Sequence, residues 1–150
     1  MSILFLLAAA SGAVAAGPLQ VATVTTIERT VAARDGTTRV VTVAGTRARP
    51  GDRLVVTLSY RNAGRAPIAD LVLADPVPRE LLYRGPATGT PEPDVSTDGQ
   101  RFAPLAALAV PATDGTRPAA PDDVIAVRWR LPGALAPGGA GRLSFRAVLK

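Results

Sequence analysis

The stretch PGDRLVVTLSYRNAG, residues 50–64, decides the fold class because it contains one complete strand and the turns at both of its ends. Every second side chain on one face is large and apolar or aromatic: Leu54, Val56, Leu58 and Tyr60. A period of two residues is typical of a half-buried β-strand. The flanking Gly and Asn residues tolerate the positive φ that turns require. The sequence therefore predicts a strand with one buried face here.

Short strands of the same kind are predicted on both sides of this stretch. Residues 19–31 and 39–43 are rich in Val, Thr and Ile and flank an Asp-Gly pair, which predicts a hairpin within an N-terminal arm over residues 17–47. Residues 124–131 and 142–150 alternate in the same way, so we expect them to form one antiparallel pair. The apolar set of the first of these two strands is Ile125, Val127, Trp129 and Leu131.

The segments between the strands are loops and turns by composition. Residues 85–93 and 111–123 are rich in Pro, Gly and Thr, and no segment after residue 17 shows a sustained helical period. About seven to nine short strands with turn signals between them predict an all-β fold, an immunoglobulin-like Greek-key β-sandwich over residues 48–150 that forms one structural unit with the arm.

Composition limits the core and the chemistry. The 150 residues suit one domain, and with 47% apolar but only 4% aromatic residues the core is built from aliphatic side chains. The five large fillers that we expect to pack in it are Tyr60, Tyr83, Phe102, Trp129 and Phe145. The chain has no Cys and no His, which excludes disulfides, histidine-based nucleophilic catalysis and ordinary zinc sites.

The N-terminus predicts export. An apolar run from Ile3 to Ala10 is followed by small residues in an A-x-A arrangement, so residues 1–16 are interpreted as a secretory signal peptide, the alternative being a buried N-terminal helix. The run is shorter than the roughly 20 apolar residues of a transmembrane helix, so we expect no membrane anchor. The predicted location is periplasmic or extracellular.

The chain is basic, with a net charge of +5, and all but one of its 17 positive residues are Arg. Four of them fall on the outward side of the two C-terminal strands: Arg128, Arg130, Arg142 and Arg146. If those strands pair, the four form a basic patch that fits an anionic polysaccharide or an envelope protein. The alternative is a solvated face with no ligand. Nucleic acid is not an expected partner, because no aromatic residues are interleaved with these arginines.

Acidic residues offer two weak candidate sites. Asp94, Ser96 and Asp98 match the opening of a calcium loop, although Leu105 stands where the bidentate carboxylate belongs, and a plain turn is the alternative. A carboxylate-only site such as Asp94 with Asp98 or Glu92 would be needed to act on a glycan. No catalytic residue, cofactor or metal is assigned.

Two further sets have simpler expectations. An intramolecular isopeptide bond would need Lys150 and Asn62, which both occur at strand ends. Asp122 and Asp123 are neighbours, and we interpret them as a turn before Val124, because adjacent residues on a strand point to opposite faces. Neither set predicts a reactive site.

The order of these motifs resembles a known family. PGD, the strand ending in YRNAG, APIADLVLADPVP, LLY, VRWRL and LAPGGA before a final alternating strand are similar to the repeat of bacterial and archaeal cell-surface proteins known as domain of unknown function eleven. The resemblance covers roughly residues 48 to 149. It implies an immunoglobulin-like sandwich on an exported surface protein, and it supplies no catalytic residues. This chain has one copy and no sorting motif, which favours a periplasmic or secreted product.

These observations predict a non-catalytic envelope or extracellular interaction module. A different possibility is a self-assembling filament or surface-layer subunit, in which the N-terminal strand from about Leu19 to Val31 completes the sheet of a neighbouring copy. A carboxylate-dependent enzyme acting on glycans is the third.

Overall fold

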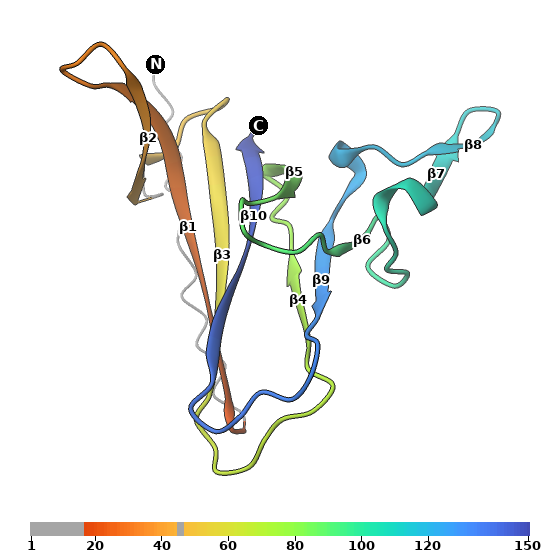
Figure 1. Cartoon of the computed structure of the whole chain (residues 1–150). Helices are drawn as coiled ribbons and strands as arrows, with labels where there is room; N and C mark the ends of the chain where they lie inside the picture. The colour runs from red at the N-terminus through yellow and green to blue at the C-terminus, as the bar shows by residue number, and fades with distance from the viewer. Residues whose placement is uncertain (1–16, 45–46) are drawn as a thin grey trace.

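The computed structural model describes residues 17–44 and 47–150, and the chain is all-β (Figure 1). The predicted signal peptide, residues 1–16, lies outside the described residues. Two short 3-10 helices, η2 (Leu105–Ala107) and η3 (Pro121–Asp123), lie between strands. No helix in the described part is long and apolar enough to cross a membrane.

The larger sheet has five antiparallel strands in the order β2-β1-β3-β10-β5. Their bounds are Leu19–Ala32 for β1, Thr38–Ala44 for β2, Arg53–Asn62 for β3, Leu81–Pro86 for β5 and Ala140–Leu149 for β10. Strand β3 is paired on both sides along nearly its whole length, with β1 from Arg53 to Asn62 and with β10 from Arg53 to Arg61. It is the sheet's central strand, as its regular alternation suggests.

A smaller sheet packs against the first (Figure 1). Its order is β4-β9-β6, with bounds Val72–Pro76, Ala126–Arg130 and Asp94–Ser96. A separate hairpin, β7 (Ala109–Ala112) with β8 (Gly115–Pro118), projects from this side of the molecule. The described residues thus contain ten strands, against the seven to nine expected.

The core lies between the two sheets and is filled by both. The larger sheet contributes Ile27, Leu54, Val56, Leu58, Leu81, Tyr83, Leu143, Phe145 and Ala147, and the smaller sheet contributes Leu73, Val95, Val127 and Trp129. Rings of Tyr83 and Phe145 meet at a centroid distance of 5.9 Å. Aliphatic side chains from two facing sheets are what a chain poor in aromatics can bury, and their burial is the main favourable term in folding.

The predicted N-terminal hairpin is confirmed, but it is less of an arm than expected. Strand β1 pairs with β2 across the turn at residues 33–37, and it also pairs with β3 over ten residues, from Leu19 to Glu28. Its Ile27 is 1% exposed. The strand is therefore an internal member of its own sheet.

The expected pairing of the two C-terminal strands is wrong. Strand β9 pairs with β4 and β6, whereas β10 pairs with β3 and β5, so the two strands belong to different sheets. The expected face of β9 is also wrong at its start, because Val124 is buried and Ile125 is 47% exposed. The 3-10 turn of η3 ends at this point, and regular alternation holds only from Ala126 onward.

Of the five expected large fillers, three are buried. These are Tyr83, Trp129 and Phe145. Tyr60 and Phe102 are only partly buried. Tyr60 lines an open groove near the end of β3, and Phe102 lies outside the strands, under the Arg128 guanidinium.

Candidate binding groove

An open groove of about 570 Å³ lies where one end of the larger sheet meets the smaller sheet. Strand β9 and the loop that follows it, residues 128–135, form one wall. Tyr60 of β3 and Arg142 of β10 contribute the second wall, and Pro91 and Glu92 contribute the third. The groove is therefore assembled from four separate segments of the chain.

Strand geometry places two arginines of β9 in the groove. Val127 and Trp129 are buried in the core, so Arg128 and Arg130, which alternate with them, point away from it. The indole Nε1 of Trp129 donates a hydrogen bond of 2.9 Å to the carbonyl of Pro91. This bond fixes the segment that carries Glu92 against the strand that carries the arginines.

The opposite wall depends on a close contact between neighbouring strands. Gly141 of β10 lies directly across from Tyr60 of β3. A Cβ at position 141 would be 2.2 Å from the Tyr60 hydroxyl, so the ring occupies the space above the glycine. Any larger residue there would displace the tyrosine from the wall. The next residue along β10 is Arg142, which lines the groove.

The four arginines that the sequence placed in one patch are divided by the structure. Arg128, Arg130 and Arg142 line the same groove, although they come from two different sheets. Arg146 does not line it. Its Nε lies 3.7 Å from Oε2 of Glu28 and its guanidinium donates a 3.0 Å hydrogen bond to Thr88.

The three groove arginines differ in what they already contact. Arg128 forms an ion pair of 3.3 Å with Asp94 and lies over the ring of Phe102, 4.5 Å from its centroid. That geometry is a cation–π contact. Within residues 17–44 and 47–150, no ion pair or side-chain hydrogen bond involves Arg130 or Arg142. Both side chains are exposed, and neither guanidinium group is engaged elsewhere in the described part of the chain.

The calcium candidate forms a turn. The Asp98 carboxylate accepts hydrogen bonds from the backbone amides of Gln100 and Arg101 and from the Ser96 hydroxyl. The two amides lower the pKa of Asp98. Ser96 accepts from the Gly99 amide, and Asp94 is turned toward Arg128 instead of toward Asp98. The described residues include no group of three or more acidic side chains that could hold a metal ion together.

The isopeptide candidates lie at opposite ends of the molecule. Asn62 ends β3 beside the start of β10, whereas Lys150 follows the end of β10, so the length of the strand, about 30 Å, separates them. Asn62 is completely buried. Its amide donates to the carbonyls of Ala66 and Leu135 and its Oδ1 accepts from the Gly64 amide. This asparagine holds two loops together beneath the groove.

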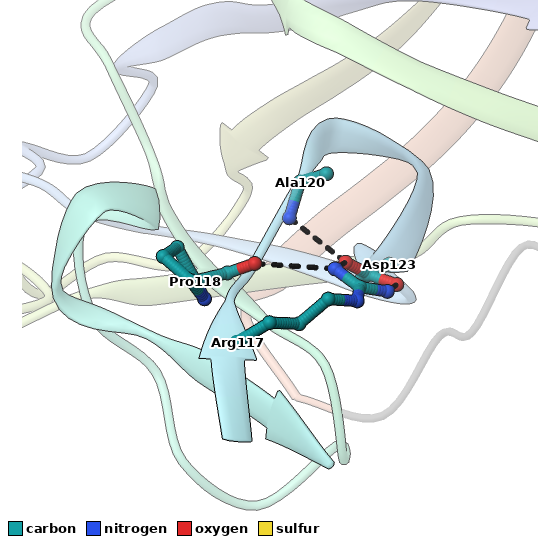
Figure 2. A network of polar contacts seen from close by, with 4 residues as sticks. All are labelled: Arg117, Pro118, Ala120 and Asp123. Carbon is teal, nitrogen blue, oxygen red and sulfur yellow. Dashed lines mark hydrogen bonds and ion pairs between the residues drawn. The ribbon is translucent and has the colours of Figure 1, made fainter. Parts of the chain in front are cut away.

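Asp122 and Asp123 form the expected turn, as part of η3, and each pairs with a different arginine. Arg84 of β5 binds Asp122 at 2.6 Å. Arg117 of β8 binds Asp123 through both terminal guanidinium nitrogens, at 2.7 and 2.8 Å. The same carboxylate accepts a hydrogen bond from the Ala120 amide (Figure 2). These contacts lower the pKa of Asp123 to about 2, the Arg117 hydrogen bond being the largest cause. The network fastens the projecting hairpin to η3.

The sequence did not single out one half-buried carboxylate. Asp75 of β4 lies between the buried residues Leu73 and Val77 and faces the core. Its Oδ2 is buried and has no hydrogen-bond partner among the described residues. Desolvation raises the pKa of Asp75 to about 6. The available signal was its position, since it shares the period of two with Leu71 and Leu73.

The walls of the groove were also missed. Residues 132–135 and Pro91 have no periodicity, so nothing in the sequence brings them beside Tyr60 and Arg142. No family model matches the chain, and neither curated proteins nor solved structures match it. The resemblance to the surface repeat stays a prediction from the order of its motifs.

Proposed function

We propose that this chain is an exported, non-catalytic module with an immunoglobulin-like Greek-key sandwich, and that its groove binds an acidic polysaccharide of the cell envelope or surroundings. The observation that carries the proposal is the pair Arg130 and Arg142. They reach one groove from two sheets and have no ionic partner in the described part of the chain. The resemblance to surface repeats supports the location.

The groove favours a carboxylated sugar chain over a compact anion. A guanidinium group binds a carboxylate through two parallel hydrogen bonds, which suits the acidic groups spaced along a polysaccharide. The groove is open and has apolar walls, including Leu131 and Pro132, against which sugar rings pack. The Arg128–Asp94 pair keeps its own charges balanced, and Glu92 on the third wall offsets part of the charge of Arg130 and Arg142, which supply the net attraction.

The carboxylates do not favour hydrolysis of such a chain. A glycosidase needs one carboxylic acid with a raised pKa and a second carboxylate facing it. The pKa of Asp98 is lowered by its backbone hydrogen bonds, and Asp94 is bound to Arg128. The observed hydrogen bonds therefore support binding better than catalysis.

Titration calorimetry with polygalacturonate tests the groove, with neutral dextran as the control ligand. We expect polygalacturonate alone to bind, and more weakly as salt increases. Exchanging both Arg130 and Arg142 for Gln should weaken binding by about tenfold or more, because hydrogen bonds to charged groups contribute about 1.5–3 kcal/mol each. Equal binding of dextran would contradict the proposal.

The matched control removes two positive charges elsewhere. Arg34 and Arg79 are exposed and lie near the opposite end of the larger sheet, outside the groove. The double exchange of Arg34 and Arg79 to Gln lowers the net charge by the same amount and should change affinity less than about twofold, since distant surface charges are screened. If it weakens binding as much as the groove variant does, the charge of the whole molecule and not the groove binds the polymer.

Export is tested separately. Expression in the native host, fractionation of the cells and intact mass of the product should give a chain cleaved near residue 16 in the periplasm or medium. An uncleaved cytoplasmic product would remove the proposed location. A gentle cross-linking step in the same experiment shows whether the partner is a polysaccharide or an envelope protein.

A further inference from the structure

The two sheets have four edge strands, and three of these edges are protected. Strand β5 has an irregular register with β10, ends at Pro86 and contacts η3 through the Arg84–Asp122 ion pair. Strand β6 has its outer side bonded to Ala103, which exchanges hydrogen bonds of 2.8 and 3.1 Å with Val95. Bulges, proline, and covering segments are the ways in which proteins block sheet edges.

The edge at β4 is protected differently. The strand is only five residues long, ends in Pro76 and points the Asp75 carboxylate toward the core. An inward-facing charge makes an edge strand unfavourable for pairing with another sheet, because continued pairing would bury that charge further. Each of the three protected edges thus has a structural feature that disfavours pairing with another strand.

Strand β2 has none of these features. Its sequence, TRVVTVA, has five β-branched residues, no Pro, no Gly, no Lys and no acidic residue. Among the described residues nothing pairs with its outer side, since it ends the sheet order. Val40 is 62% exposed. Figure 1 shows the turn of the β1–β2 hairpin reaching past the ends of the neighbouring strands, and no other described strand pairs with the outer side of β2.

The direction of the peptide groups on β2 follows from the turn. The amide of Ala33 donates to the Thr37 carbonyl at 2.7 Å, so residues 33 and 37 face each other as a hydrogen-bonded pair. In an antiparallel ladder, bonded and non-bonded pairs alternate. The peptide groups of Arg39, Val41 and Val43 therefore point to β1, and those of Thr38, Val40 and Thr42 point to the open edge.

We propose that β2 pairs antiparallel with β2 of a second copy of this chain about a two-fold axis at Val41, joining two five-stranded sheets into one sheet of ten strands. This register overlaps the whole of β2. Val40 then exchanges backbone hydrogen bonds with Thr42 of the second copy, through the peptide groups that point outward. The core-side face stays continuous, because Val43 pairs with the buried Ile27 and residues 39, 41 and 43 keep that face in both copies.

The charge pattern of β2 fits its own image in this register. Arg39 lies opposite Val43 of the second copy, and the two Arg39 side chains are about 13 Å apart along the strands. Valine lies opposite valine at the axis. Directly opposed like charges would disfavour the pairing of a strand with its own copy, and this register contains none. A second copy is therefore the occupant that this edge matches.

Single cysteines test the register, because the chain has none of its own. Non-bonded antiparallel pairs bring Cα atoms to about 4.5 Å, within the range of a disulfide. Val41→Cys should give a disulfide-linked dimer under mild oxidation. Val43→Cys is the matched control, since its thiol would be about 13 Å along the strand from its image and should cross-link far less. Equal cross-linking of the two variants would overturn the proposed axis.

A proline variant tests the hydrogen bonds of the edge. Val40→Pro removes an amide that points away from β1, so the hairpin keeps its own bonds. Light scattering of the purified, processed chain should show a dimer that depends on concentration, with the dissociation constant raised about tenfold or more by Val40→Pro and little changed by Val40→Thr. Circular dichroism checks that both variants are folded. A chain that stays monomeric up to about 1 mM would overturn the proposal.

Discussion

Two sets of strands enclose the same core but are held in place differently. One set is the long strands β1, β3 and β10 of the larger sheet, and the other is the short strands β4, β6 and β9 of the smaller sheet. Strand β3 is paired along both sides, whereas β9 is paired over five residues with β4 and three with β6. Single side chains supply the rest on this side of the molecule: the Trp129 indole binds Pro91 beside the smaller sheet, and Arg117 of the β7–β8 hairpin binds Asp123 of η3. One half distributes its stability over many backbone bonds, while the other concentrates it in a few side chains.

The largest effect should come from Trp129→Ala. It removes the largest core side chain of the smaller sheet and its bond to Pro91, so we expect a loss of about 3–5 kcal/mol in the free energy of unfolding and no cooperative thermal transition. Calorimetry measures this. Trp129→Phe keeps most of the volume and removes the indole donor, at a cost of about 1–2 kcal/mol. An unchanged melting midpoint for Trp129→Ala would show that this side chain is not central to the smaller sheet.

The next largest effect should come from Asn62→Ala, which should lower the free energy of unfolding by about 3 kcal/mol. Asn62 belongs to the well-paired larger sheet but stabilises loops through its side chain, which donates two hydrogen bonds and accepts one. Their loss leaves buried backbone groups without partners. Urea unfolding gives the value. The control is Thr57→Val, which removes one 3.0 Å contact to Ser144 between neighbouring strands and should cost less than about 1 kcal/mol. If Asn62→Ala and Thr57→Val lower the free energy of unfolding equally, Asn62 has no special role in holding the loops.

Asp75→Asn should stabilise the protein at neutral pH. The folded-state pKa of about 6 is above the ordinary aspartate value of 3.8, so the burial cost is absent below pH 4, grows between pH 4 and pH 6 and is fully present above pH 6. The shift corresponds to at most ~3 kcal/mol, which partial exposure reduces to about 1–2 kcal/mol. Melting curves at pH 4.5 and 7.5 should show wild type weaker at the higher pH and the variant nearly unaffected. If the melting temperatures of the wild type and the variant change equally with pH, Asp75 is not the cause of the pH dependence.

The smallest effect should come from Arg117→Gln. The ion pair with Asp123 is exposed, and exposed pairs contribute little, so the melting midpoint should barely change. Hydrogen exchange in β7 and β8 should nevertheless speed up, because this pair fastens the hairpin to η3. Exchange in β3 is the internal control. A global shift in both regions would mean that the hairpin supports the core.

What the sequence predicts well is the half that depends on backbone pairing. The alternation at Leu54, Val56 and Leu58 reports which face is buried, and the structure confirms it for β3 and for β10. The sequence does not indicate which strands pair with each other. The alternation in β9 and β10 is compatible with an antiparallel pair, yet the loop between them crosses from one sheet to the other. Periodicity carries no information about which sheet a strand joins.

The candidate groove was predictable only in part. Alternation indicates that Arg128, Arg130 and Arg142 point away from the core, and the structure does bring these three together. The reason is not the one expected, because they meet across two sheets and not on one face. Arg146 has the same alternation and lies elsewhere, beside Glu28. Only the three-dimensional course of the irregular segments 91–92 and 132–135 separates these cases.

The position of β3 between β1 and β10 has a mechanical consequence. Both neighbours are antiparallel to β3 and therefore parallel to each other, with Leu19 at one end of the sheet and Lys150 at the other. A pulling force applied between these two residues runs along the strands and loads the backbone bonds of both ladders in shear, so that they resist together instead of opening one after another. The three strands form a tension-bearing unit, and no disulfide is needed to make it one.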